Sequence, residues 1–435
     1  MNISIVSVFP DIYQLFLKTS LIRRAQESGI VSYDVDSYSN FSKAGSRIDA
    51  PSFGHGAGML IKPCVVQAAV EEKEKKYGKS LKIFFSPHGK KLDQVYFQKL
   101  AKKAQEIGHV MLLPARYEGM DARVEQEYAD EIVSLGDFVL MGGDLPVMVF
   151  LEGMLRLVPG VVGKKESIEK ESFSQAFVDH PEFTEPVEWK GYKVPDVVRS
   201  GNHGAVDAWR ENESIKRSVK NHFDWVRSHN MTKDQKEKTS LHIPPHYVVL
   251  MHDQVIIDSS GRIGASSVTS IDIHDIARSA KTYGIKNFFI VTPLKDQHKI
   301  VKKLIDFWHG SVGKNYNKNR YKALQIVKIC SSLQEVIEQI ELAENVKPLV
   351  VTTSARVENK DSMITYYDQE KVWQKEKPVL LLFGTAQGLS SDVIKQSDYL
   401  LLPVYGFSAF NHLSVRSAVA IILDRWLGIN IKQVK

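Results

Sequence analysis

The chain has 435 residues, of which 43% are hydrophobic and 25% are charged, and its formal net charge is +6 at neutral pH. This length exceeds that of one ordinary domain and predicts two or three domains. The apolar share excludes disorder as the main state of the chain. The mild basic excess is compatible with a polyanionic partner, but many unrelated proteins share it.

The cysteines and the N-terminus indicate where the protein works. Cys64 and Cys330 are far apart, and no Cys or His stands beside them at the spacing of metal ligands. We therefore expect neither a disulfide nor a bound metal. Residues 1–8 have no basic leader and are typical of a β-strand, and no apolar run has the length of a membrane span. These features predict a cytoplasmic protein with no membrane partner.

Apolar runs of strand length occur in both halves of the chain. The first half contains Ile3–Val8, Leu81–Phe85, Val110–Leu113 and Phe138–Met141. The second half contains Tyr247–Met251, Asn287–Val291, Gln325–Ile329, Leu349–Thr352, Val379–Phe383 and Tyr399–Leu402. Most of these runs are continuously apolar rather than alternating, which is typical of parallel strands covered by helices on both faces. The sequence therefore predicts two open α/β regions.

A polar middle region, from about Ser167 to Lys238, separates these two α/β regions. It contains several prolines and a helical pattern from about Ala205 to Val226. The charged run Lys233–Lys238 is followed by Pro244 and Pro245, a combination typical of a solvated junction. We expect the main domain boundary there.

The two α/β regions also echo each other. In the first, a strand enters a turn ending at Gly119, and a second strand is followed by Gly142-Gly143 and an apolar helix. In the second, a strand enters the turn Gly384–Gly388, and another strand is followed by a glycine loop and the helix Ser414–Leu427. The shared order of elements indicates a fusion of two related modules.

Glycines at strand ends let a backbone approach a ligand closely, and such ligands are usually nucleotide-like. Neither half has a dinucleotide-binding fingerprint or a P-loop, so a nicotinamide-dependent oxidoreductase is disfavoured. Gly54–Gly58 is also rich in glycine, but it follows a polar segment, and a flexible turn is the favoured interpretation there.

Six blocks in residues 1–235 resemble the TrmD family of bacterial tRNA (guanine-N1)-methyltransferases, in the family's order: Phe53–Leu60, Ser86–Gln94, Arg116–Asp121, Gly136–Pro146, Pro159–Gly163 and Ser200–His203. The resemblance implies a trefoil-knotted SPOUT domain over residues 1–165, followed by a linker and a small helical tRNA-binding region over 166–240. It also implies S-adenosylmethionine as cofactor, a homodimer whose active site uses both subunits, and N1 methylation of the guanosine immediately 3′ of the tRNA anticodon.

The same resemblance implies the residues of the first site. The family's catalytic arginine falls on Arg156, and its general-base aspartate falls on Glu171. A carboxylate can remove the N1 proton, and a cation can balance the charge that develops on O6. Each residue also has a plain alternative: Arg156 could neutralise a helix C-terminus, and Glu171 could belong to a solvated charge run.

The implied S-adenosylmethionine contacts of the first half include two departures from the family, since Ala115 stands for a glycine and Phe138 for a tyrosine. These contacts are Ser86, Pro87, Gly89, Ala115, Tyr117, Glu118, Gly119, Leu135, Gly136, Asp137, Phe138, Val139, Leu140, Gly142 and Gly143. Candidate contacts to tRNA phosphates lie in the helical region and are Lys193, Arg199, Arg210, Lys216, Arg217 and Lys220.

Residues 245–435 resemble a second SPOUT branch, related to the SpoU-type ribose 2′-O-methyltransferases, through Ile273–Gly284, Leu382–Leu389 and Asn411–Ala418. The resemblance implies an S-adenosylmethionine pocket formed by Phe383, Gly384, Thr385, Leu402, Pro403, Asn411, Leu413 and Ser414. It gives Arg278 the role of assisting loss of the ribose 2′-hydroxyl proton, while the residue type equally suits a phosphate.

This half departs from the SpoU pattern at two places. Asp272 or His274 stands near the position of an asparagine, and Ala386-Gln387 stands in the glycine turn where a glutamate is usual. A catalytically silent module for dimerisation or RNA docking is therefore the alternative. In addition, Lys314–Lys322 interleaves cations with aromatic residues, which can pair phosphates and stack unpaired bases of a second RNA target. An exposed loop with incidental charge explains that segment equally well.

Overall fold

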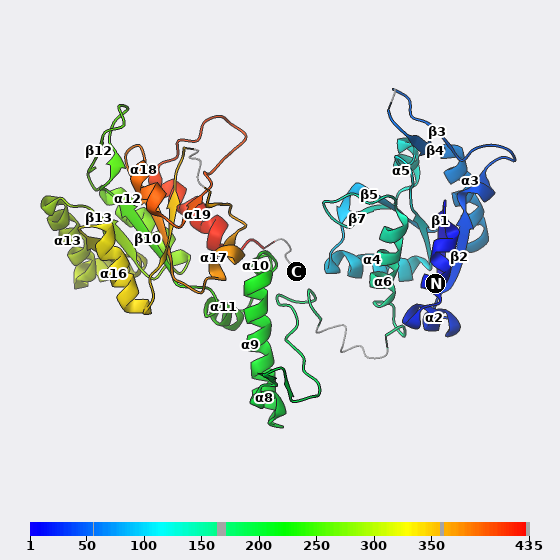
Figure 1. Ribbon diagram of the computed structural model, residues 1–435, viewed down its shortest axis with the longest axis horizontal. Coiled ribbons are helices and arrows are strands. Elements are labelled where there is room, and N and C mark those ends of the chain that lie inside the picture. Colours follow the sequence, from blue (N-terminus) through cyan, green and yellow to red (C-terminus); the bar gives the residue numbers. More distant parts are fainter. Residues whose placement is uncertain (55, 163–170, 357–360, 432–435) are drawn as a thin grey trace. The chain divides into compact units, whose positions relative to one another are not determined.

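The computed structural model describes residues 1–54, 56–162, 171–356 and 361–431. It divides the chain into two compact units, Met1–Ser174 and Gln175–Lys435 (Figure 1). The charge run around residues 164–170 and the start of the expected linker lie outside the described residues. The helical region belongs to the second unit, although we expected the main boundary near 233–245. The functional division at residues 166 and 245 stays a prediction.

The first unit is built on a five-stranded parallel sheet. Its strands are β1 (Asn2–Ser7), β2 (Ser32–Ser37), β5 (Leu81–Lys91), β6 (His109–Leu113) and β7 (Glu131–Ser134), in the spatial order β2-β1-β6-β5-β7. All of their pairings are parallel. A two-stranded antiparallel ribbon, β3 (Asp49–Pro51) and β4 (Met59–Ile61), stands apart from this sheet.

Helices cover both faces of this sheet, as the continuously apolar strands predict. One face packs against α1 (Tyr13–Leu17), α2 (Ser20–Glu27), α4 (Gln94–Ile107) and α6 (Asp144–Leu155). The other face packs against α3 (Pro63–Tyr77) and α5 (Ala122–Tyr128).

One strand assignment in the first half is wrong. Residues 138–141 form a loop, in which Phe138 is 54% and Met141 91% exposed, and the neighbouring strand is β7. An apolar run can serve as the wall of a binding site as well as a buried strand, and periodicity does not distinguish the two. The polar strand β2 was not expected from the sequence, because its Asp34 and Asp36 interrupt the apolar pattern while pairing with buried Lys73.

The second unit contains a seven-stranded sheet whose pairings are all parallel. Its six longer strands confirm all six runs expected in this half. They are β10 (His246–Met251), β13 (Phe288–Val291), β14 (Val327–Cys330), β15 (Leu349–Thr353), β17 (Val379–Gly384) and β18 (Tyr399–Leu401), with the short β16 (Met363–Ile364) at one edge.

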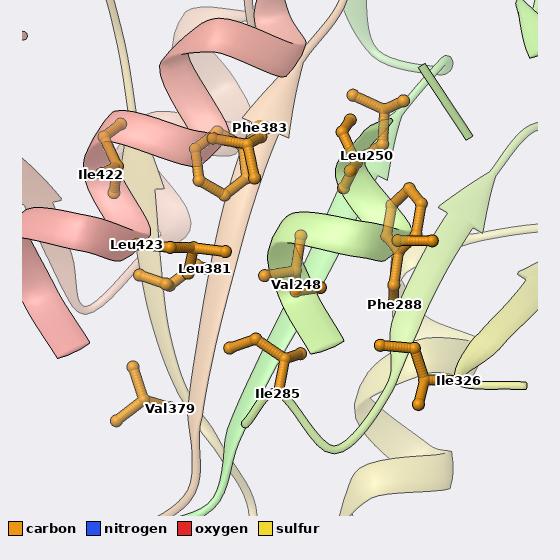
Figure 2. Packing of buried hydrophobic residues seen from close by; sticks show 14 of the residues in the cluster. Val248, Leu250, Ile285, Phe288, Ile326, Val379, Leu381, Phe383, Ile422 and Leu423 are labelled. Carbon is orange, nitrogen blue, oxygen red and sulfur yellow. The ribbon is translucent and has the colours of Figure 1, made fainter. Parts of the chain in front are cut away.

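Helices again lie on both faces of this second sheet. One face is covered by α12 (Ser270–Thr282), α13 (Lys295–His309), α15 (Lys318–Leu324), α17 (Gln369–Trp373) and α19 (Val415–Leu427). The other is covered by α16 (Leu333–Glu344) and α18 (Ser391–Gln396). Figure 2 shows strand side chains such as Leu381 and Phe383 packed toward Ile422 and Leu423 of α19.

The helical region consists of α8 (Asp196–Arg199), α9 (His203–Asn221), α10 (Phe223–Arg227) and α11 (Lys233–Ser240). Ile215 and Val219 of α9 join the core of the second unit, and Arg227 Nη1 donates to the carbonyl of Arg425 at 2.6 Å. These contacts explain why the region groups with the C-terminal half. In the described part of the chain, no helix has the length and apolarity needed to cross a membrane.

The two sheets share one strand order. Numbered along the chain, the five strands of the first sheet lie in the order 2-1-4-3-5. The second sheet repeats this order with β13, β10, β17, β15 and β18, and adds β14 and β16 at its edges. This shared topology supports the expectation that the two halves are related modules.

Candidate active sites

A cavity of about 330 Å³ lies in the first unit at the carboxyl ends of β5, β6 and β7. In parallel α/β sheets, ligands bind at this edge. Twelve of the fifteen expected cofactor contacts line the cavity: Ser86, Pro87, Ala115, Tyr117, Glu118, Gly119, Leu135, Phe138, Val139, Leu140, Gly142 and Gly143. The exposed loop after β7 thus forms one of its walls.

Three expected contacts, Gly89, Gly136 and Asp137, do not line the cavity. A Cβ atom on Gly89 would lie 2.7 Å from the carbonyl carbon of Ile132, because β5 and β7 approach closely there. Asp137 forms an ion pair with Lys91. A Cβ on Gly136 would lie 2.8 Å from the Phe138 ring. In this structure the two glycines therefore serve close packing.

Backbone rather than side chain forms the floor of the first cavity at Gly143. Its N–H donates to the carbonyl of Ala115 at 2.8 Å, and a Cβ added there would lie 2.8 Å from Pro114 Cα. The loops after β6 and before α6 thus touch without intervening side chains. Bare backbone and a volume of about 330 Å³ suit a nucleoside-like cofactor of the size of S-adenosylmethionine.

A buried carboxylate, which the sequence did not reveal, holds this floor in place. Asp144 has no exposed surface and accepts from the hydroxyls of Ser7 at 2.5 Å and Tyr13 at 2.9 Å. It also accepts from Nε of the cavity residue Arg116 at 2.7 Å. Burial first, and the Asp144 charge second, raise the pKa of Tyr13, so the phenol remains a donor. Asp144 therefore fixes Arg116 at the cavity wall.

The two expected catalytic residues of the first half lie side by side. Arg156 caps the C-terminus of α6, and its guanidinium forms an ion pair with the carboxylate of Glu171. The Arg156 side chain is 40% exposed and that of Glu171 19%. Neither residue lines the cavity. The structure brings the pair together across 15 residues of sequence.

The second unit has a cavity of about 470 Å³ at the carboxyl ends of β10, β15, β17 and β18. All eight expected cofactor contacts line it: Phe383, Gly384, Thr385, Leu402, Pro403, Asn411, Leu413 and Ser414. A Cβ on Gly384 would lie 2.5 Å from the Leu389 nitrogen, so the turn after β17 closes tightly. Its size and backbone-rich wall again fit a nucleoside-like cofactor.

The turns after β6 and β17 share an unusual backbone. Tyr117 has φ +59° and Gly119 +117°, and Ala386 has φ +52° and Gly388 +103°. Left-handed conformations at non-glycine residues cost of order 1–3 kcal/mol and cluster at ligand sites. In both turns, two residues with positive φ are separated by one residue, so the two cavities share this turn conformation.

A chain of hydrogen bonds fixes the protonation of His252, which lines the second cavity and was not expected. Thr385 Oγ1 donates to the carbonyl of Met251 at 2.8 Å, so it accepts from Ser266 Oγ at 2.5 Å. Ser266 Oγ must then accept from His252 Nδ1 at 3.0 Å. The proton of His252 is therefore on Nδ1, and its buried Nε2 has no partner among the described residues. Burial lowers the pKa of His252 to about 4 and keeps the ring neutral.

An arginine other than the expected one borders the second cavity. Arg416 lines it and lies 3.4 Å from Asp272 and 3.7 Å from Asp275. Asp272, one of the two candidates at the SpoU asparagine position, also lines the cavity, whereas His274 packs beside Trp308. Arg278 is exposed on α12 and does not line this cavity.

Comparison with known proteins finds a family match for each half of the chain. Residues 1–228 match the family of tRNA (guanine-1)-methyltransferases TrmD, and residues 245–428 match a family of SAM-dependent RNA methyltransferases. The chain is therefore an S-adenosylmethionine-dependent RNA methyltransferase. It belongs to the TrmD family of tRNA (guanine-N1)-methyltransferases.

Its relatives differ in how much of the chain they share. The tRNA (guanine-N(1)-)-methyltransferase of Oleidesulfovibrio alaskensis is 35% identical, and the match covers 98% of this chain and 99% of that one. The Thermotoga petrophila enzyme is 41% identical over 50% of this chain and 87% of its own. The Bacillus subtilis enzyme is 35% identical over 54% of this chain and 97% of its own. The first half thus corresponds to nearly the whole of some relatives.

Proposed function

We propose that the first half methylates N1 of the guanosine immediately 3′ of the tRNA anticodon, as a cytoplasmic homodimer with a knotted SPOUT fold. Glu171 would accept the N1 proton, and Arg156 would balance the negative charge that develops on O6. S-adenosylmethionine supplies the methyl group when bound. The observation that carries this proposal is the Arg156–Glu171 ion pair.

This ion pair has a mechanistic consequence. In the substrate-free chain each group neutralises the other, so guanine must separate them before either can act. The pair holds the carboxylate at a fixed place beside the guanidinium until guanine binds. It also argues against Glu171 as one member of a solvated charge run, since its carboxylate has a defined partner.

The position of this ion pair supports the homodimer. The cavity lies at the start of α6, where Gly143 and Pro146 line it, and Arg156 lies at the other end. A helix of 12 residues rises by about 18 Å. One chain alone therefore holds the cofactor cavity and the ion pair at opposite ends of a helix. A second copy that brings its own pair to this cavity would complete the site.

Six cations in and beside the helical region were expected to contact tRNA, and three of them are tied to acids. Lys193 pairs with Glu188, Arg199 with Asp196 and Arg210 with Glu182. The remaining three, Lys216, Arg217 and Lys220, are exposed on α9 and have no ion pair within the described residues. We propose that these three hold the phosphates most directly.

The test compares Glu171→Gln with Glu171→Asp in single-turnover transfer to a tRNA with G immediately 3′ of its anticodon. Gln keeps the shape but cannot take a proton, so we expect the rate to fall about 10²-fold or more. Asp restores the commoner family residue and should keep or raise the rate. Glu152→Gln, on the exposed face of α6, is the matched control. An unchanged Gln rate would place the base elsewhere.

For the second half, we propose transfer of a methyl group to a ribose 2′-hydroxyl of an RNA, with Arg278 assisting proton loss. The cavity in which all eight expected contacts gather carries this proposal. Arg278→Ala should remove a 2′-O-methyl mark from cellular RNA and leave guanine-N1 methylation unchanged. Nucleoside mass spectrometry of RNA from the variant strain, with Lys286→Ala as control, measures both marks.

The place of Arg278 outside the cavity favours a second candidate, a catalytically silent dimerisation or RNA-docking module. The fragment Gln175–Lys435, which forms one compact unit, can decide between them. We expect calorimetry to detect one S-adenosylmethionine bound per fragment chain. Absence of binding at millimolar cofactor would favour the silent module.

A further inference from the structure

The basic charge of the chain is concentrated in one short segment. Between Asp306 and Glu335 there are five lysines and arginines and no acidic residue, whereas the whole chain has a net charge of only +6. This segment contains the stretch Lys314–Lys322, for which the sequence left open a role in RNA contact or an incidental charge. Three structural observations favour RNA contact.

First, the cations of this segment form no ion pair with an acid in the part of the chain that the structure describes. The stretch forms two short helices, α14 (Ser311–Tyr316) and α15, separated at Asn317, whose side chain caps α15 by accepting from the Arg320 N–H at 2.9 Å. Lys314, Lys318 and Lys322 are exposed and have no ion pair with any described residue. Incidental surface cations of this chain often have acidic neighbours, as Lys238 does with Glu211 at 2.8 Å.

Second, aromatic rings accompany these cations. The Arg320 guanidinium stacks over Trp308 of α13 at 4.9 Å from the ring centroid, and its buried Nε lacks a hydrogen-bond partner among the described residues. The Tyr316 ring lies 6.1 Å from Trp308 and is 78% exposed. An exposed ring among unpaired cations can stack an unpaired base while the cations hold its phosphates.

Third, helix α12 connects this surface with the second cavity. His274 of α12 lies 5.6 Å from Trp308, and Arg320 is among the charges that lower its pKa, after burial. Arg278 and Lys281 follow His274 by four and seven residues, so they lie on the same side of α12, next to α15. The N-terminal turn of α12, through Thr269 and Asp272, borders the cavity. Arg278 and Lys281 therefore extend the basic surface of α15 onto the C-terminal half of α12, the helix whose first turn borders the cavity.

We propose that this α14–α15 surface, formed by Arg278, Lys281, Lys314, Tyr316, Lys318 and Lys322, binds a single-stranded or loop segment of RNA and guides it to the second cavity. The proposal deepens the proposed function of the second half, since it rests on that half acting on RNA. The four lysines contact the phosphates, Tyr316 stacks one base, and Arg278 keeps its proposed role in proton loss. Single-stranded RNA fits better than a regular helix, because only unpaired bases expose a face to stack on the ring.

The test measures binding of a fluorescein-labelled 12-nucleotide oligouridine to the full chain by anisotropy. This probe lacks guanine, the base that the first site modifies. We expect Lys318→Glu/Lys322→Glu to weaken binding about tenfold or more. The slope of log affinity against log salt should fall by about 1.4, because each phosphate contact on a single strand contributes about 0.7. Tyr316→Ala should also weaken binding, and Tyr316→Phe should restore it.

The control, Lys347→Glu/Lys375→Glu, changes the charge equally at exposed positions near the amino ends of β15 and β17. It should alter affinity less than about twofold, and all variants should keep guanine-N1 transfer. Equal weakening by both double variants would overturn the proposal. So would binding to phosphatidylserine vesicles in place of the oligouridine. A ribose mark that needs Arg278, with oligouridine binding indifferent to Lys318 and Lys322, would refute this surface alone.

Discussion

Two buried histidines should make the second unit sensitive to mild acid. His246 accepts from Trp426 Nε1 at 3.0 Å, which leaves its other nitrogen to donate to the carbonyl of Pro244 at 2.6 Å. His252 donates through Nδ1 to Ser266. A second proton on His246 would break the hydrogen bond from Trp426, and one on Nε2 of His252 would have no acceptor among the described residues. Burial lowers the pKa of both to about 4.

The size of the effect follows from the difference between folded and unfolded states. In the unfolded chain each histidine takes up its proton near pH 6.5. In the folded chain it does so only near pH 4. The unfolded state thus binds more protons between these values, and stability falls as the pH drops from about 6.5 to 4. Each residue should cost about 2 kcal/mol at pH 5, which is large against a typical domain stability of about 5–15 kcal/mol.

The positions of the tryptophans make the stability of the second unit measurable by fluorescence. All six tryptophans of the chain lie at residues 189–426, inside the second unit, so their fluorescence reports only its unfolding. Urea titrations should give a free energy of unfolding that is about 4 kcal/mol lower at pH 5 than at pH 7, with His246 and His252 each contributing about half. His246→Gln and His252→Gln should each flatten the pH dependence by about half. Variants that keep the full dependence would refute the assignment to these rings.

Three further predictions concern the first unit. Arg156→Ala should lower guanine transfer about 10²–10³-fold in single-turnover assays, with S-adenosylmethionine binding by calorimetry nearly intact, since the charge that it balances exists mainly in the transition state. Asp144→Asn should destabilise the unit by about 3 kcal/mol in urea unfolding followed by circular dichroism, because Arg116 loses its buried partner. Gly143→Ala places a Cβ 2.8 Å from Pro114 Cα, so the cofactor stoichiometry of the full chain should drop to the second site alone; two bound molecules would contradict this.

The sequence predicts the strands well where the residues are apolar only because the sheet is buried on both faces. The runs at 247–251 and 379–383 are buried on both faces, and they are strands. The run at 138–141 is apolar because Phe138, Val139 and Leu140 line a cavity. Strand β2 is polar because Asp34 and Asp36 neutralise buried Lys73. The local sequence pattern indicates that a residue is apolar but does not show whether it lies in a sheet core or in the wall of a cavity.

Residues that line the cavities could be predicted where they lie in turns, and were missed where they depend on distant partners. Gly143 and Gly384 line their cavities through local turn geometry that a motif records. Asp144 meets Ser7 across 137 residues, and Ser266 meets Thr385 across 119. Sequence spacing does not predict such pairs, because only the sheet topology brings the two residues together. The tautomer of His252 follows from the Ser266–Thr385 hydrogen bond, so the sequence could not predict it either.

The two halves share the backbone arrangement around their cavities and differ in the side chains that line them. Strand order and the left-handed turn residues are shared, whereas the first cavity has Arg116 held by buried Asp144 and the second has neutral His252 and the Arg416–Asp272 pair. Because backbone forms part of the wall in both cavities, side chains are free to diverge toward different acceptor atoms without changing that wall. A guanine nitrogen needs a carboxylate base, and a ribose hydroxyl, with its far higher pKa, needs cations and aligned acceptors. In the function that we propose, that separation of roles is the physical reason one chain holds two methyl-transfer sites with different substrates.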